Sequence, residues 1–340
     1  MFKYLIIVSP LGFLYGSAGA FLSPENLVGR SGAKFPPDAS TLAGLFFSEN
    51  KRNEIAPHDQ LKHELFVSGP FWAKQQDEEN FYVPLPRHRI IEDGKDDEWR
   101  LNAQRKWERD PQKQDQDIEA EYRWQSINSW KRPKNSDIRK NKEMSHAPWE
   151  YVSFLHPQMK PNERHVLDED GLFLENAVQM DEGFSLVYLS TYALPDGWYR
   201  FGGEGHMVEI SCQEISSDSM VHELLTTKIQ KACALLTPGV WGSNHLSYRY
   251  PQHSEFPNQG MKMLTDKPIS YRYRMGQRST GRGRLGRGRY AVPPGTIYVF
   301  KKPLDKTWWE FPEDWFPKEG LPLKHLGCGL CLPVEIDGVA

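Results

Sequence analysis

The chain has 340 residues, of which 39% are hydrophobic, 12% aromatic and 26% charged. This composition predicts a globular protein of about two domains, because domains commonly hold on the order of 150 residues. The 42 basic and 45 acidic residues exclude a protein whose whole surface attracts polyanions, so any nucleic-acid site must be local. Four cysteines are too few for a disulfide-stapled secreted scaffold, and no apolar run is long enough to span a bilayer. We therefore expect a cytoplasmic protein that contacts no membrane.

The first residues fit two interpretations. Residues 1–20 contain one lysine, an apolar stretch and a small-residue end, which is the outline of a signal peptide. Ser9, Pro10 and Gly12 interrupt the apolar stretch, and Tyr4–Val8 also matches a buried first strand. The residues alone leave both interpretations open.

A helix start is predicted within residues 35–45, because prolines and capping residue types precede an apolar run there. The glycine- and serine-rich residues before it predict a polar loop, which carries Arg30 and Lys34. Free N–H groups at a helix N-terminus favour phosphate, so these two cations are candidate RNA contacts. The alternative is an ordinary surface loop.

Residues 61–149 contain a predicted strand, a turn, an extended segment and a charged region. The strand is expected at 61–68, the turn at Gly69–Trp72 and the extended segment at 81–87. Residues 92–149 are rich in charged and amide side chains and predict a partly helical, partly mobile insertion. Its charges alternate in sign, which favours a solvated face, whereas its tryptophans suggest docking onto a protein or onto stacked bases.

The second half predicts strands at 164–176, 183–193, 205–215, 269–274, 296–302 and 330–336, with a helix at 217–236. Strand, helix and strand therefore occur in both halves. This order predicts an α+β fold of two modified ferredoxin-like (RRM-like) domains with a charged insertion. We expect residues 1–91 to form part of the first domain, 92–149 the insertion and 150–340 the second domain.

The strongest local feature is an arginine- and glycine-rich loop at residues 271–290. No acidic residue occurs between Asp266 and Asp305. Arginine donates bidentate hydrogen bonds to phosphate, glycine keeps the backbone pliable, and the tyrosines of this loop offer stacking faces. The alternative is a solvated loop, but unbalanced arginines repel one another and favour an anionic partner. The predicted RNA contacts are Arg272, Arg274, Arg278, Arg282, Arg284, Arg287 and Arg289.

Two further motifs carry weaker signals. A glycine turn holds Arg200, Gly202, Gly203 and His206, and its glycines allow a ligand to approach the backbone closely. His206 could be a general base for an RNA 2′-hydroxyl, but no second group completes an acid–base pair, so we expect a phosphate contact or a structural role. The lone CxxC at Cys328–Cys331 lacks a second CxxC, so we expect no metal and no cofactor.

Eight short motifs resemble, in order, those of the RAMP proteins of CRISPR effector complexes. They are similar above all to the third Cmr subunit of type III-B systems, which holds the crRNA 5′ handle. The motifs are Ser9–Leu11, Phe35–Pro37 with Ser40–Leu45, Ser68–Phe71, Phe81–Pro86, Asp170–Phe173, Phe201–Gly205, Ala291–Tyr298 and Gly327–Leu330.

This resemblance implies a noncatalytic RNA-binding subunit with two ferredoxin-like folds. Its implied partners are the crRNA 5′ handle, the large palm-domain CRISPR subunit and the first backbone RAMP subunit. It places Ser40 and Thr41 at the first helix N-terminus as RNA contacts, and it favours a strand over a signal peptide at residues 4–8. The insertion does not align with the family; Trp124 or Trp130 could be wedges of a hairpin laid across the crRNA.

Two other functions remain open. A RAMP endoribonuclease would cut precursor crRNA with His206 and without a metal. A scaffold would instead use the arginine-rich loop to bind acidic protein surfaces.

Overall fold

The computed structural model describes residues 1–14, 35–113, 117–157, 165–166, 172–202, 205–243, 245–277 and 283–339. Within these ranges strands predominate over helices, and every strand pairing is antiparallel. The fold is α+β, as the sequence predicts. Arg30, Lys34, Gly203, Arg278 and Arg282 lie outside the described residues, as do the first two residues of the motif at 170–173.

The first sheet contains eight of the described strands, in the order β12-β13-β1-β11-β2-β3-β7-β8. In the centre of the sheet the side chains on both faces are buried, and Leu5, Ile6 and Val187 are inaccessible to solvent. The bounds are β1 Tyr4–Pro10, β2 Val67–Lys74, β3 Tyr82–Pro84, β7 Trp124–Ser126, β8 Met144–Ser145, β11 Phe184–Ser190, β12 Gly197–Phe201 and β13 His206–Glu214.

The centre of this sheet has a ferredoxin-like topology. Counted along the chain, β1, β2, β11 and β13 are strands one to four, and their spatial order β13-β1-β11-β2 is 4-1-3-2. Helix α1 (Ala39–Asn53) follows β1 and contacts β2. It forms because Ala39, Leu42, Ala43 and Phe46 recur at helical spacing and are buried on one face. Along the chain, the edge strand β12 comes between β11 and β13, at the place where a ferredoxin-like fold has its second helix.

The second sheet repeats the same topology with shorter strands. In chain order they are β14 (Ala232–Leu235), β17 (Lys262–Leu264), β22 (Ile297–Val299) and β25 (Cys331–Pro333). Their spatial order β25-β14-β22-β17 is again 4-1-3-2. The short helix α4 (Met220–Thr226) precedes β14, and three 3-10 turns lie between β22 and β25. These turns are η4 Trp308–Glu310, η5 Glu313–Trp315 and η6 Leu323–Leu326.

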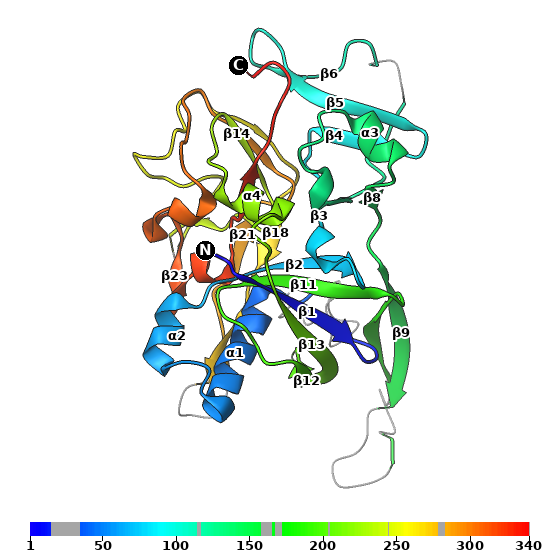
Figure 1. Ribbon diagram of the computed structural model, residues 1–340, viewed down its shortest axis with the longest axis vertical. Helices are drawn as coiled ribbons and strands as arrows, with labels where there is room; N and C mark the ends of the chain where they lie inside the picture. Colours follow the sequence, from blue (N-terminus) through cyan, green and yellow to red (C-terminus); the bar gives the residue numbers. More distant parts are fainter. Residues whose placement is uncertain are drawn as a thin grey trace.

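The charged region at 92–149 is mostly folded structure that adds strands to the body. A three-stranded sheet and the helix α3 lie at one end of the molecule (Figure 1), and β7 and β8 extend the first sheet. The first sheet thus takes strands from all three segments expected in the sequence. The additional elements are β4 Arg89–Glu92, β5 Lys95–Leu101, β6 Trp107–Arg109, η3 Ile127–Ser129 and α3 Asn135–Lys140.

The tryptophans of this region anchor it to the body and are not wedges. Trp130 is buried, and its Nε1–H donates to the Pro333 carbonyl at 2.7 Å. The Trp107 Nε1–H donates to the Met263 carbonyl, and Trp124 packs edge-on against Trp72 of β2. The suggestion that Trp124 or Trp130 projects from a hairpin is therefore wrong. A two-stranded hairpin does extend beyond the body (Figure 1), but it is β9 (Trp149–Pro157) paired with β10 (Leu172–Met180).

Three local predictions were also wrong. The segment 61–68 is not one strand, because α2 (His58–Glu64) ends before β2 begins. Gly69–Trp72 is no turn and lies inside β2. The helix expected at 217–236 ends at Thr226, and its apolar end forms β14, whose four residues are all buried. An unbroken apolar run of this length suits a fully buried strand as well as a helix.

The remaining elements are short pieces beside the two sheets. They include the 3-10 turn η2 and four two-stranded ladders. Their bounds are η2 Glu78–Asn80, β15 Trp241–Gly242, β16 Ser247–Tyr248, β18 Ile269–Tyr271, β19 Arg274–Gln277, β20 Gly283–Leu285, β21 Arg289–Ala291, β23 Lys318–Glu319 and β24 Leu321–Pro322.

Motifs far apart in the sequence meet where the two halves join. Gly327, in the left-handed conformation, lies so close to Ser68 of β2 that a Cβ would come within 2.3 Å of the Ser68 Oγ. The Gly327 carbonyl accepts from the Thr237 hydroxyl at 2.5 Å. Similarly, the Gly295 carbonyl accepts from the Arg87 N–H at 2.9 Å. These glycines thus have a packing role between the halves.

Candidate nucleic-acid interface

The arginine-rich stretch forms two short ladders, and its described ends are not a structureless loop. β18 pairs with β21, so that Tyr271 lies opposite Arg289. Beyond them β19 pairs with β20, with Met275 opposite Arg284. Figure 1 shows β18 and β21 near the middle of the molecule. The chain therefore folds back on itself and brings arginines from both ends of the stretch together.

The described arginine side chains of this hairpin have different environments. Arg289 is buried, with 7% of its side chain exposed. Arg272 is half-buried and donates from Nε to the Gly286 carbonyl at 2.8 Å. Arg287 is exposed, and its Nη1 donates to the Nδ1 of His245 at 3.0 Å. Arg274 and Arg284 lie on the strands, and their side chains are outside the described set.

Glu319 is a carboxylate among these arginines that comes from a different part of the chain. It lies on β23, and its Oε2 accepts from the Arg289 Nη2 at 3.0 Å. Its Oε1 accepts from the backbone N–H of Arg287 at 2.6 Å. The acid-free island of the sequence is therefore partly balanced in space. Sequence reasoning missed Glu319 because nothing in the stretch 271–290 indicates which distant acid packs against it.

A hollow of about 550 Å³ opens beside this cluster. It is lined by His245, Arg272, Leu285, Gly286, Arg287, Gly288 and Glu319. The nearby Tyr290 ring is 60% exposed, and its backbone N–H donates to the Ser247 hydroxyl. Exposed arginine, histidine and tyrosine around an open hollow can bind phosphate and stack bases of a single strand.

Burial keeps a tyrosine of this hairpin in its protonated form. It raises the pKa of Tyr273, and the nearby Glu319 raises the pKa further. The Tyr273 hydroxyl therefore remains a donor, and it bonds the Glu319 carbonyl at 2.6 Å. This bond ties β23 to the hairpin independently of the arginines.

The glycine turn of the first sheet is separate from the arginine hairpin. Arg200 on β12 is exposed and lies opposite Met207, while His206 begins β13 opposite Phe201. The half-buried Gly202 is in the left-handed conformation that glycine tolerates best. These residues lie at an edge of the eight-stranded sheet, whereas the arginine hairpin forms its own ladders.

The N-terminus of α1 lies close to the hairpin base. Ser40 and Thr41 are in its first turn, and the Thr41 N–H donates to the Asp38 carbonyl at 2.8 Å. Asp38 is near enough to Tyr271 of β18 to raise the pKa of its hydroxyl, although burial is the main cause. The Cys328 thiol donates to the same hydroxyl at 3.2 Å. The helix start, the hairpin and the terminal glycine loop thus converge on Tyr271.

The cysteines of this chain are free thiols. All four lie in the described part of the chain, and none is in a disulfide. Burial raises the pKa of the Cys331 thiol well above its ordinary value, with Cys233 as a second cause. No group of three or more His, Cys, Asp or Glu within the described ranges is placed to hold a metal ion.

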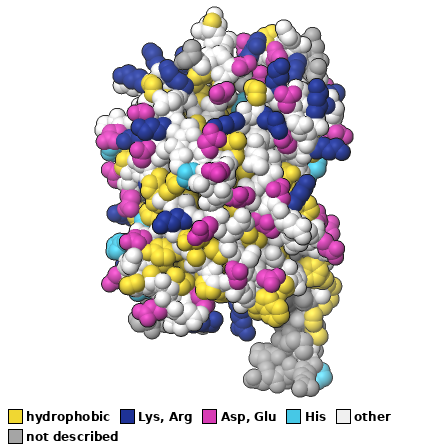
Figure 2. Space-filling view, in the orientation of Figure 1, with side chains coloured by type: hydrophobic (Ala, Val, Ile, Leu, Met, Phe, Trp, Pro, Cys, Tyr) yellow, Lys and Arg dark blue, Asp and Glu magenta, His cyan; other side chains and the backbone are white. Residues whose placement is uncertain are grey.

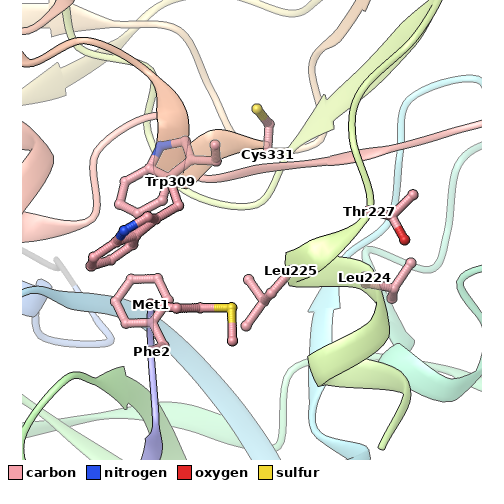
Figure 3. Close-up of a pocket in the computed structure, with 8 residues that line it drawn as sticks. Met1, Phe2, Leu224, Leu225, Thr227, Trp309 and Cys331 are labelled. Atoms are coloured by element: carbon pink, nitrogen blue, oxygen red, sulfur yellow. The ribbon is translucent and has the colours of Figure 1, made fainter. Parts of the chain in front are cut away.

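A second cavity, at the N-terminus, is too small for a ligand. Its volume is about 10 Å³, which is the space of one water molecule at most. Figure 3 shows it enclosed by mostly apolar side chains, with Met1 and Phe2 facing Leu225 and Trp309. It is a packing gap between the first strand and the second half of the chain.

The comparison with protein families decides the identity. A family model described as CRISPR-associated protein (Cas_Cmr3) matches residues 13–335. The chain belongs to the Cas_Cmr3 family. This membership confirms the resemblance to the type III-B Cmr subunit and makes the chain a subunit of a type III CRISPR effector complex. No curated protein sequence matches it.

Solved structures resemble this Cas_Cmr3 chain at low sequence identity. A chain of the type III-B Cmr-beta complex bound to cognate target RNA and AMPPnP is 11% identical, with a TM-score of 0.51 over 87% of this chain and 86% of that chain. A chain of a Csm3–Csm4 subcomplex of type III-A is 12% identical, with a TM-score of 0.40 over 88% and 97%. The first of these likenesses supports the fold alone.

None of the helices in the described ranges has the length and apolar character that crossing a membrane requires.

Proposed function

We propose that the chain is a noncatalytic subunit that binds the 5′ handle of the crRNA through the arginine hairpin. The observation that carries this proposal is the hollow beside the hairpin, where Arg272, Arg287 and His245 stand around one carboxylate. The cationic groups exceed the single acid, so the site favours a polyanion. Tyr290 adds an exposed ring on which a base can stack.

The first helix and the glycine turn supply further contacts in this proposal. Ser40 and Thr41 lie in the first turn of a helix that starts next to β18, and in this proposal their hydroxyl groups contact the RNA. Arg200, Gly202 and His206 extend the track along the edge of the first sheet. Arg30, Lys34, Gly203, Arg278 and Arg282 belong to the proposed track by their charge or motif alone. The large palm-domain subunit and the first backbone RAMP subunit are the proposed protein neighbours.

Salt-dependent RNA binding tests the proposal. Purified protein is titrated against crRNA with and without its 5′ handle, followed by fluorescence anisotropy over a salt series, and the RNA is then run on a denaturing gel. We expect tighter binding with the handle, a steep decrease in affinity with salt, and intact RNA. Cleavage of the RNA by the wild type but not by His206→Ala would instead establish the endoribonuclease. Weak binding that does not depend on salt would favour the scaffold.

A further inference from the structure

The position of Glu319 raises a question that its charge alone does not answer. A carboxylate next to a surface that binds RNA repels phosphate, so its presence should weaken binding. Yet Glu319 is the acid that contacts the arginine hairpin most closely within the described residues. We propose that Glu319 is a positioning residue for RNA binding, which holds the 285–288 loop so that Arg287 faces the RNA. This inference rests on the proposed function.

Three contacts attach Glu319 to the hairpin from both ends. Its two carboxylate oxygens accept from the Arg287 N–H and the Arg289 guanidinium, at 2.6 and 3.0 Å. Its backbone carbonyl accepts from the Tyr273 hydroxyl. Only 17% of the side chain is exposed, and charge-assisted hydrogen bonds are strongest where water competes least.

The loop lies directly on this carboxylate. The Gly286 N–H donates to the Tyr273 carbonyl at 2.8 Å, while the Gly286 carbonyl accepts from Arg272. A Cβ at Gly286 would lie 3.0 Å from the Tyr273 carbonyl oxygen and 3.3 Å from the Glu319 Oε2. A side chain at Gly286 would therefore be tightly packed against both oxygens, so the loop lies close to β23 at this point.

Glu319 also divides the arginines into two roles. It neutralises Arg289, which is buried and could not reach a ligand without moving. Arg272 and Arg287 remain as lining residues of the hollow. Without the carboxylate, the buried Arg289 charge would repel its neighbours and push the loop outward. The carboxylate thus prepares the loop for RNA at the cost of some repulsion of phosphate.

The direction in which RNA affinity changes when the charge of Glu319 is removed distinguishes a positioning role from mere proximity. Glu319→Gln keeps the size of the side chain and removes its charge. If Glu319 were only a nearby acid, the variant would bind RNA more tightly than the wild type. Positioning predicts the opposite: roughly fivefold to tenfold weaker binding of the handle-containing crRNA at a fixed salt concentration, with an unchanged salt slope. Glu335→Gln, which removes an exposed acid elsewhere in the C-terminal part, should bind as tightly as the wild type or slightly more tightly.

A second measurement without RNA separates this inference from the proposed function. Amide hydrogen exchange of Arg287 is compared between the wild type and Glu319→Ala in the free protein. We expect at least tenfold faster exchange at Arg287 in the variant, with unchanged exchange in β1 and β11 as evidence of an intact fold. Unchanged exchange at Arg287, or tighter RNA binding by Glu319→Gln, would overturn the positioning role. Absence of salt-dependent RNA binding by the wild type would overturn the proposed function, and the exchange result would then decide the role of Glu319 in the loop.

Discussion

The charged region at 92–149 and the arginine hairpin at 271–290 are both rich in charged side chains but differ in how these charges are paired. In the first, acids and bases pair with one another. Buried Asp97 is the partner of Arg109, and Asp96 accepts from both Lys113 and Arg139. Figure 2 shows basic and acidic side chains side by side over the end of the molecule that this region occupies.

In the arginine hairpin the described cations outnumber the acid that contacts them. Glu319 pairs with Arg289, while Arg272 bonds a carbonyl and Arg287 a histidine. Charge density alone therefore does not identify a nucleic-acid surface. The excess of one sign after local pairing is the basis for proposing such a surface, because only that excess attracts a polyanion.

The largest effect that tests this comparison is expected at Asp97. Its carboxylate is inaccessible to solvent, pairs with Arg109 and accepts from the Glu98 N–H. Asp97→Ala removes the buried carboxylate that pairs with Arg109 and should lower the free energy of unfolding by about 3 kcal/mol. Urea unfolding measures this, and the exposed Glu119→Gln should change it by less than about 0.5 kcal/mol. If the region were only a solvated face, Asp97→Ala would be as mild as the control.

A smaller loss of stability is expected at Arg289. Its buried guanidinium pairs with Glu319, so Arg289→Ala should lower the free energy of unfolding by about 2 kcal/mol. Arg287→Ala should leave stability within about 0.5 kcal/mol, because its side chain is exposed. Thermal or urea unfolding of both variants tests the division of roles. Equal losses would show that the two arginines are not distinguished by burial.

The pH dependence of stability should report on the base of the charged region. His88 is buried. Burial is the main cause that lowers its pKa well below the ordinary value of 6.5, and the charge of the nearby Arg89 is the second cause. The folded protein keeps this imidazole neutral, whereas the unfolded chain takes up a proton below pH 6.5. The contribution of His88 to the free energy of unfolding is therefore fully present above pH 6.5 and is lost as the pH falls. The loss at pH 5 should be at most about 2 kcal/mol.

Unfolding of His88→Gln between pH 7 and 5 checks this expectation. The variant should show a flatter profile than the wild type. Burial also lowers the pKa values of His325 and of the N-terminal amine, so both contribute with the same sign and part of the slope remains. An identical profile in both proteins would mean that His88 does not titrate on unfolding.

The smallest effect is the most specific to RNA. Arg287→Ala should reduce the log–log salt slope of RNA binding by ~0.7, the value for one phosphate contact with a single strand. Lys140→Ala, an exposed cation of the charged region, should leave the slope unchanged. If Lys140→Ala lowered the slope and Arg287→Ala did not, the RNA would lie on the charged region and the comparison would be reversed.

Three adjacent strands of the first sheet could be predicted from the sequence. β11 and β13 lie within the expected ranges and β1 contains the expected Tyr4–Val8, because apolar residues mark these strands and turn residues bound them. The beginning of α1 was predicted from its prolines and caps. The second half was harder: β14, with four consecutive buried residues, has the same pattern as the end of a helix. The α2 helix has a single buried residue, Leu61, which is too little for a periodic signal.

The candidate site could be predicted only in part. The arginine hairpin follows from its composition, and the structure brings its two ends together. Glu319 and His245 could not be found, since they belong to segments whose proximity to the hairpin depends on tertiary packing. The tryptophans of the charged region were misread for the same reason. Trp130 looks exposed in a polar stretch, but the chain that covers it is Pro333 and its neighbours, about two hundred positions away.

The pairing of β1 has a consequence for the order of folding. Tyr4 lies opposite Ser190 and Glu214, so β1 receives its two neighbours only when the chain has grown by roughly 180–210 residues. Until then its apolar residues Leu5–Val8 have no sheet to join, and they are a candidate site for binding by chaperones on the ribosome. Among the strands of the first sheet, β1 therefore waits through the longest stretch of chain before its neighbours are made.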